Sequence, residues 1–115
     1  MNNDCIFCKI AAGEFGTKFL FEDEELLAFR DINPQAPVHV LIIPRKHIAR
    51  INQLQDNHRE LAGKMILLAN RLAVEEGISD EGYRLVFNCG PDGGQEVEHI
   101  HLHLIGGRQM TWPPG

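Results

Sequence analysis

The sequence predicts an α+β fold in which a mostly antiparallel, five-stranded sheet carries one long helix on a face. Three observations predict this class. Five short segments carry the β-branched or alternating apolar residues of strands and end at turn residues. One longer segment repeats apolar side chains at helical spacing. The connections between successive strands are short, which favours antiparallel neighbours over repeated βαβ units.

The predicted elements follow one another as short helix, strands, long helix and strands. Gly13 ends the first helix, and an acidic turn at residues 23–25 joins the first two strands. The third strand is a β-branched run that stops at Pro44, which predicts a central place in the sheet. In chain order we predict a helix at residues 5–12, strands at 18–22, 26–30 and 38–43, a helix at about 56–76, and strands at 83–88 and 97–105.

The long helix has the clearest pattern. Asp56 or Asn57 is expected to cap its start, and Gly77 is expected to end it. An apolar stripe runs along one side and is expected to pack on the sheet. Its main members are Leu61, Met65, Leu68 and Leu72.

Length, charge and cysteine content limit the classes of function. The 115 residues suit one domain that spans residues 1–115. A net charge of -5 argues against a nucleic-acid partner but leaves room for a small anionic ligand. No long apolar run predicts a membrane span, and residues 1–4 do not open a secretory signal. Three cysteines without such a signal favour a reducing, cytoplasmic setting.

The last predicted strand carries an alternating histidine run. Successive side chains of a strand point to opposite faces, so the three histidines are expected on one face and the apolar residues on the other. The histidines are His99, His101 and His103, and the apolar residues are Ile100, Leu102 and Leu104.

Three readings of this run are open. It is a solvent-exposed strand, a three-histidine metal centre, or a reaction centre in which the histidines have different tasks. A span of about 13 Å at strand rise disfavours convergence of all three on one ion. A neutral imidazole is a good nucleophile toward phosphorus if a carbonyl holds Nδ1–H and leaves Nε2 free. The backbone of Gly93 and Gly94 is then a candidate phosphate cradle.

The histidine run resembles the signature of the histidine triad superfamily. The likeness extends to residues 29–39, 43–48, 93–95 and 106–115, where the sequence is similar to the Hint branch, the histidine triad nucleotide-binding proteins. It covers nearly the whole chain. The resemblance implies a homodimer whose sheets join, binding of purine nucleoside monophosphates such as AMP or GMP, and hydrolysis of P–N bonds in adenosine 5′-phosphoramidates and of aminoacyl adenylates.

The resemblance also implies roles for individual residues. His101 would attack the α-phosphorus and form a nucleotidyl-histidine that water cleaves, while His103 and His39 would contact the phosphate and help to move protons. Asp31 would bind the ribose hydroxyls, and Trp112 would reach the partner's site. The base pocket would consist of Ile6, Phe7, Ile10, Phe29 and Ile32, for which a plain core role is an equal alternative. The other nucleotide-binding residues would be Asn88, which matches a residue near the phosphate, and Gly94, Gln95, Glu96 and Val97.

Cys5 and Cys8 form a C-x-x-C pair, which is half of a zinc site. Some relatives complete such a site with two histidines, and the matching residues here are His47 and His99. The resemblance therefore implies one structural zinc per chain. Two core cysteines are the simpler alternative.

The sequence leaves three hypotheses for the function. The first is an enzyme that transfers a nucleotidyl group to His101 and then to water. The second is a module that binds a nucleotide or protein with incidental turnover. The third is a hydrolase of dinucleoside polyphosphates.

Overall fold

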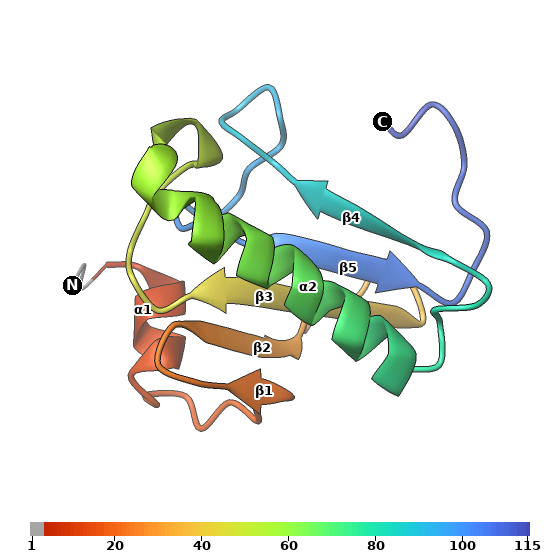
Figure 1. The fold of residues 1–115 in the computed structure, drawn as a ribbon, viewed down its shortest axis with the longest axis horizontal. Helices are drawn as coiled ribbons and strands as arrows, with labels where there is room; N and C mark the ends of the chain where they lie inside the picture. The colour runs from red at the N-terminus through yellow and green to blue at the C-terminus, as the bar shows by residue number, and fades with distance from the viewer. Residues whose placement is uncertain (1–3) are drawn as a thin grey trace.

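The computed structural model describes residues 4–115. Residues 1–3, part of the segment for which no secretory signal was predicted, lie outside the described residues. A five-stranded antiparallel sheet has the order β1-β2-β3-β5-β4, as predicted in class, and α2 crosses one of its faces (Figure 1). The elements are α1 (Ile6–Ala11), β1 (Phe21–Glu22), β2 (Leu26–Arg30), β3 (Val38–Pro44), the 3-10 helices η1 (Ile51–Gln53) and η2 (Asp56–His58), α2 (Arg59–Glu75), β4 (Tyr83–Phe87) and β5 (Leu102–Gly106).

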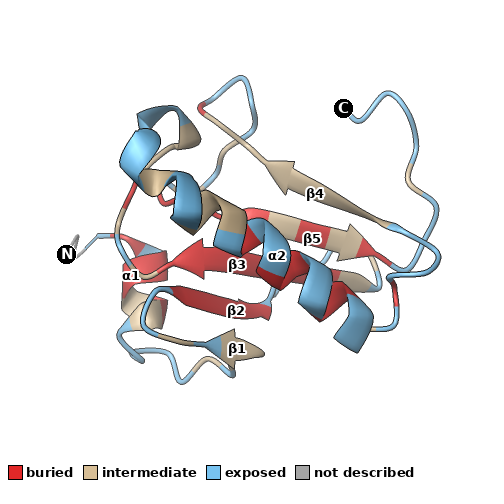
Figure 2. Ribbon diagram, in the orientation of Figure 1, coloured by how far each residue is buried: buried red, intermediate tan, exposed pale blue. Residues whose placement is uncertain are grey.

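The two faces of the sheet pack against different helices. Along β2, Leu26 and Ala28 join the core under α2, whereas Leu27 and Phe29 join a second cluster with α1. The residues of β3 alternate in the same way. Period-two alternation therefore divides the interior into an α2 side and an α1 side. Figure 2 shows β2 and β3 buried along most of their length, while the edge strand β4 is half-buried.

The start of the long helix differs from the prediction. Residues 56–58 form the 3-10 helix η2, and α2 begins only at Arg59. Neither Asp56 nor Asn57 caps it. Gln55 and His58 instead exchange side-chain and backbone hydrogen bonds across the turn. The predicted end is confirmed, because α2 stops at Glu75 and Gly77 has a φ of 76°.

Two predicted strands are shorter in the structure. Residues 18–20 do not belong to β1, and residues 97–101 do not belong to β5. The β5 ladder begins at Leu102, opposite Ile42. Beyond that point the Pro44 carbonyl accepts a hydrogen bond from the His99 ring, and the Ile100 N–H donates to Ile48. These contacts replace regular strand pairing.

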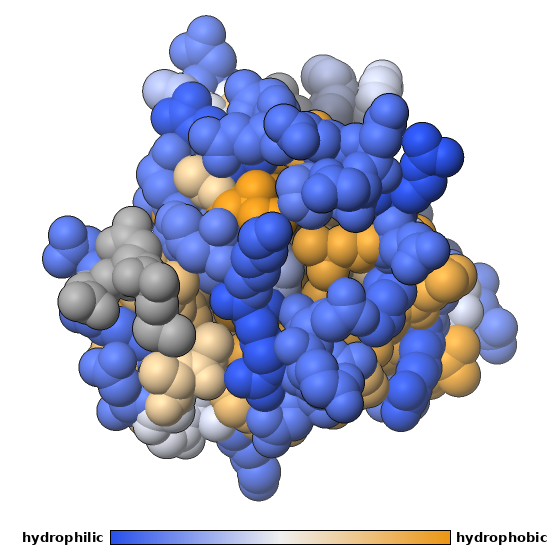
Figure 3. All heavy atoms as spheres, turned by 60° about the vertical axis from the view of Figure 1, so that its left-hand side comes forward, coloured by the Kyte–Doolittle hydropathy of each residue, from blue (hydrophilic) through white to orange (hydrophobic). Residues whose placement is uncertain are grey.

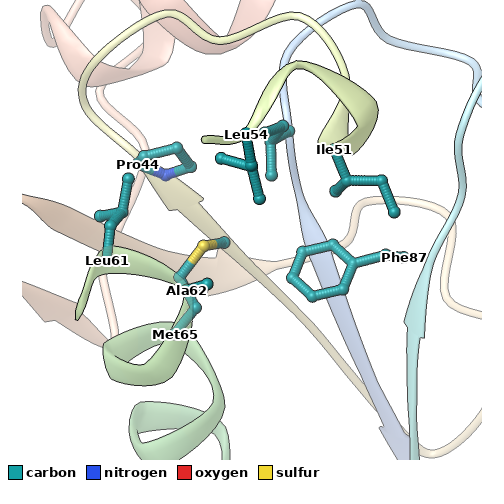
Figure 4. Close-up of a pocket in the computed structure, with 8 residues that line it drawn as sticks. Pro44, Ile51, Leu54, Leu61, Ala62, Met65 and Phe87 are labelled. Carbon is teal, nitrogen blue, oxygen red and sulfur yellow. The ribbon is translucent and has the colours of Figure 1, made fainter. Parts of the chain in front are cut away.

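A cavity of about 240 Å³ lies on the α2 side of the sheet. Figure 4 shows Met65 of α2, Phe87 of β4 and residues of the η1 segment around it. Its remaining lining is also apolar, so it extends the core toward the surface: Pro44, Ile51, Leu54, Leu61, Ala62 and Ile100.

The surface beside α1 is mostly hydrophilic, with apolar side chains visible in gaps between polar ones (Figure 3). Across residues 4–115, no helix combines the length and the apolar character that a membrane span requires.

Candidate active site and metal centre

A cavity of about 650 Å³ opens on the α1 side of the sheet. Strand register explains its floor, because directly paired residues share a face. Leu41 of β3, His103 of β5 and Val86 of β4 form one row across the sheet. His39 and Ile105 form part of the next row. The walls come from α1, from the loop after β2 and from the loop before β5.

Most of the residues predicted for catalysis and nucleotide binding line this cavity. They are Ile6, Phe7, Ile10, Phe29, Asp31, Ile32, His39, Asn88, Gly94, Glu96, Val97, His101 and His103. Two predicted residues do not line it. The Gln95 side chain binds the backbone of Gly90, Ala49 and Val97, so it braces its own loop. Trp112, which was expected at a partner's site and not in its own chain's cavity, is 81% exposed.

Several lining residues were not predicted. Leu41, Val86 and Ile105 are floor residues whose only signal is their place two residues from, or directly across from, a histidine of the run. Gln35 also lines the cavity, and its N–H donates to His39 Nδ1, a backbone contact for which the sequence has no signal. The others are Thr17, Arg30 and Asn33.

His101 is buried and has a defined tautomer. Its Nδ1 lies 2.7 Å from the carbonyl oxygen of His99. A carbonyl only accepts, so Nδ1 must carry the proton, and Nε2 of the neutral ring holds a free lone pair. The Phe7 ring packs edge-on against the imidazole, with centroids 5.0 Å apart. The arrangement leaves one ring nitrogen of His101 available as a nucleophile.

His39 and His103 form a directed hydrogen-bond chain. The Gln35 N–H donates to His39 Nδ1 at 3.0 Å, so the proton of the neutral ring is on Nε2. That Nε2–H lies 2.9 Å from His103 Nδ1 and donates to it. His103 must then carry its own proton on Nε2, which is the one buried side-chain nitrogen or oxygen in residues 4–115 without a hydrogen-bond partner. An unpaired N–H donor in a ligand-sized cavity is suited to an anionic oxygen.

Burial keeps these two rings neutral. It lowers the pKa of His103 to about 4, with further lowering by His101 and His39. It also lowers the pKa of His39, against the opposing effect of the Asp31 carboxylate. The donor chain described above is therefore the form present at neutral pH.

Asp31, His39 and His103 place three potential metal ligands within 4.8 Å of one another. The tautomers argue against a metal there, because His39 gives its Nδ1 lone pair to the Gln35 amide and carries a proton on Nε2. Asp31 Oδ1 accepts from the Asn33 N–H, and Oδ2 lies 3.4 Å from His39 Nε2. The carboxylate thus borders the cavity as an acceptor.

The glycine loop is shaped by packing and turn geometry. A Cβ at Gly93 would collide with the backbone of Cys89, so only glycine fits. The N–H groups of Gly94 and Gln95 donate to Pro91 and Gly90. These two hydrogen bonds hold the turn together, so the Gly94 amide of the predicted phosphate cradle is already used within its own loop.

The histidine run divides between two places. His101 and His103 line the cavity, with ring centroids 4.9 Å apart. The His99 ring is fully buried and lies among Cys5, Cys8 and His47. The three histidines therefore do not converge on one ion.

The Cys/His cluster fits a tetrahedral metal. Its four donor atoms lie within 4.8 Å of one another, and the closest pairs are 3.2–3.7 Å apart. Ligands on a tetrahedral zinc are separated by about 3.3–3.8 Å when Zn–S is about 2.3 Å and Zn–N about 2.0–2.1 Å. His99 Nε2 donates to the Pro44 carbonyl at 2.7 Å, which leaves the Nδ1 lone pair for a metal. The donor set of two sulfurs and two nitrogens suits zinc.

The fold and the cavity define a class: an α+β protein in which β5 and the segment just before it present an imidazole nitrogen with a free lone pair beside a free imidazole N–H. A family model described as HIT domain matches residues 12–110. The chain belongs to the HIT family.

Individual relatives are similar over almost the whole chain. A crystal structure of a HIT family hydrolase from Legionella pneumophila Philadelphia 1 is 62% identical, with a TM-score of 0.95 and coverage of 97% of this chain and 100% of that one. The 14 kDa zinc-binding protein of Brassica juncea is 48% identical over 97% of this chain and 100% of its own length. The histidine triad nucleotide-binding protein of Candida albicans is 32% identical, with a TM-score of 0.79 and coverage of 96% and 83%.

Proposed function

We propose that this chain is a purine nucleoside phosphoramidate hydrolase of the Hint branch, with His101 as the nucleophile. The observation that carries the proposal is the pair of tautomers in the cavity: a free lone pair on His101 Nε2 and a free N–H on His103 Nε2. A pure binding module needs no free nucleophile. The name of the Legionella relative, a HIT family hydrolase, supports an enzyme.

The reaction follows from these two groups. His101 Nε2 attacks the α-phosphorus, the P–N bond breaks, and the leaving amine takes up a proton. Water then attacks the phosphorus of the nucleotidyl-histidine, gives up a proton, releases the nucleoside monophosphate and restores the ring. The His103 N–H donates to a phosphoryl oxygen as charge develops in each step. Asn88, Gly94, Glu96 and Val97 border the same region.

The apolar end of the cavity is the proposed base site. Ile6, Phe7 and Ile10 project from α1, and Phe29 and Ile32 come from β2 and the following loop. Ile32 is fully exposed, so a purine ring placed there would cover it. Asp31 is next to this end and is the proposed acceptor for the ribose hydroxyls.

Zinc is the proposed structural metal, held by Cys5, Cys8, His47 and His99. It would supply a cross-link between α1 and the segments that flank β3 and β5. The zinc-binding name of the Brassica relative supports this assignment. None of the four donor residues lines the cavity, so the proposed metal has no direct part in bond breaking.

A homodimer is also proposed. The edge strand β4 has one unpaired side, and the outer face of α2 exposes Ile66, Leu67 and Val74. Leu67 is 68% exposed and Val74 65% exposed. A second copy that paired at β4 would cover this apolar surface and continue the sheet.

The test is release of AMP from adenosine 5′-phosphoramidate. The wild-type chain is expected to release AMP, and His101→Ala is expected to slow release by about 10³-fold or more. Calorimetric binding of AMP to His101→Ala checks that the cavity is intact. Binding without turnover by the wild type would point to a binding module. Turnover of a dinucleoside polyphosphate but not of the phosphoramidate would contradict the P–N assignment.

A further inference from the structure

We propose that the Cys5/Cys8/His47/His99 cluster controls the catalytic cavity: zinc in the cluster sets the positions of His101 and α1, so zinc and nucleotide bind with positive coupling. The nucleotide half of this inference rests on the proposed function. Two independent connections in the structure join the cluster to the cavity. One runs through His99 and the other through α1.

The first connection is His99 itself. Its ring uses Nδ1 to face Cys5 at 3.2 Å and His47 at 3.2 Å. Its backbone carbonyl accepts the Nδ1–H of His101 at 2.7 Å, the bond that leaves the nucleophilic nitrogen free. The residue lies outside the β5 ladder, which begins at Leu102, and its segment is held by the hydrogen bonds of the His99 ring to Pro44 and of the Ile100 N–H to Ile48. A metal on Nδ1 adds a second restraint to the His99 ring and so helps to fix the carbonyl that orients His101, which makes His99 a positioning residue.

The second connection is α1. This helix carries the two cysteines, Cys5 at its N-cap and Cys8 in its first turn, and the three cavity residues Ile6, Phe7 and Ile10. The Phe7 ring contacts both the His99 and His101 rings, with centroids at 5.8 Å and 5.0 Å. With six residues, α1 is too short to be stable by itself and depends on its tertiary contacts.

The metal changes what holds α1. The cluster gathers two sulfurs and two ring nitrogens in a largely buried space, and the lone pair of His99 Nδ1 lies 3.2 Å from His47 Nδ1. One cation satisfies all four donors and ties α1 to the segments after β3 and before β5. Without it, α1 is held mainly by the apolar contacts of Phe7, Cys8 and Ile10. The wall of the cavity and the orientation of His101 then loosen together.

Such coupling is reciprocal, because each ligand must change the affinity of the other by the same factor. Coupling between two sites of one protein is typically about 5- to 150-fold. We expect AMP to bind about tenfold more tightly to the zinc-loaded chain, and zinc to bind more tightly by the same factor when AMP is present.

The experiment uses the full chain, zinc-loaded and zinc-stripped by a chelator. Calorimetry measures AMP binding to each form, and competition with a chromophoric chelator measures zinc affinity with and without AMP. Amide hydrogen exchange of residues 6–11 and the ring NMR signals of His101 report on the cavity without nucleotide. Cys8→Ser removes one ligand, and Cys89→Ser is the matched control, because Cys89 is the one cysteine outside the cluster.

We expect zinc to slow exchange in α1, shift the His101 ring signals and tighten AMP binding in the wild type and Cys89→Ser, but not in Cys8→Ser. If neither form binds AMP while zinc still alters α1 and His101, control of the cavity stands and the nucleotide function fails. The proposal is overturned if zinc leaves both readouts and AMP affinity unchanged. It is also overturned if zinc removal abolishes exchange protection throughout the sheet, since the metal would then stabilise the whole fold.

Discussion

At the scale of single residues, hydrogen-bond direction gives the cavity its chemistry. Two backbone groups, the His99 carbonyl and the Gln35 amide, determine the tautomers of His101 and His39. The tautomer of His103 follows from that of His39. Backbone contacts therefore give two histidines different tautomers, so that one presents a lone pair and the other an N–H in the same cavity.

The neutral state of His103 predicts that acid destabilises the fold. Its pKa is about 4 in the folded chain and about 6.5 when unfolded, so the unfolded state binds more protons between these values. The free energy of unfolding should fall as pH decreases from about 6.5 to 4. Urea denaturation at several pH values across this range measures the free energy of unfolding. His103→Gln is the comparison, because loss of metal in acid would affect both proteins alike and only the wild type has the His103 titration. Parallel curves for the two proteins would refute the assignment.

At the scale of elements, the sequence was sufficient where periodicity was strong. The order of helices and strands, the central position of β3 and the end of α2 at Gly77 were predicted from spacing and turn residues. The start of β5 was not, because the alternation of residues 97–105 resembles a strand whether or not a partner strand is present. The ring of His99 donates a hydrogen bond to the Pro44 carbonyl, and the local sequence has no signal for that tertiary contact.

The site was predicted to a similar extent. Resemblance to a known family indicated the residues that line the cavity and those that form the cluster. It did not indicate floor residues such as Val86, which depend on strand register. It also could not show that the amides of Gly94 and Gln95 are consumed within their own turn.

Two glycines of the α2 region provide a matched test of backbone geometry. Gly77 has a φ of 76° after the helix, and Gly63 lies inside the helix; a Cβ at either position meets no atom within 4 Å. Gly77→Ala should lower the free energy of unfolding by about 1 kcal/mol through backbone strain. Gly63→Ala should raise it by about 0.5–1 kcal/mol through helix propensity. Thermal or urea denaturation measures both, and equal signs would contradict the account.

At the scale of the whole molecule, the sheet separates two tasks. Its α2 side holds the larger core, and its α1 side holds the cavity and the cysteine–histidine cluster. The exposed apolar residues of α2 and the free edge of β4 are the surfaces on which the proposed dimer depends.

If the proposed dimer forms, the mass in solution is expected to be twice 13.0 kDa. Leu67→Glu places a charge on the exposed face of α2 and should shift the chain toward the monomer, because burial of an unpaired charge is unfavourable. Phe15→Glu is the control, since Phe15 is also exposed but lies outside α2. Sedimentation equilibrium distinguishes the states. A wild-type monomer at micromolar concentration would rule out the dimer.

The proposed function depends above all on His101 carrying the nucleotidyl group during turnover. The most direct measurement is the intact mass of the chain after reaction with adenosine 5′-phosphoramidate and a quench in base, followed by peptide mapping of the adduct. We expect one nucleotidyl group on the wild-type chain, located on His101, and none on His101→Ala. An adduct on another residue, or release of AMP at the wild-type rate by His101→Ala, would contradict it.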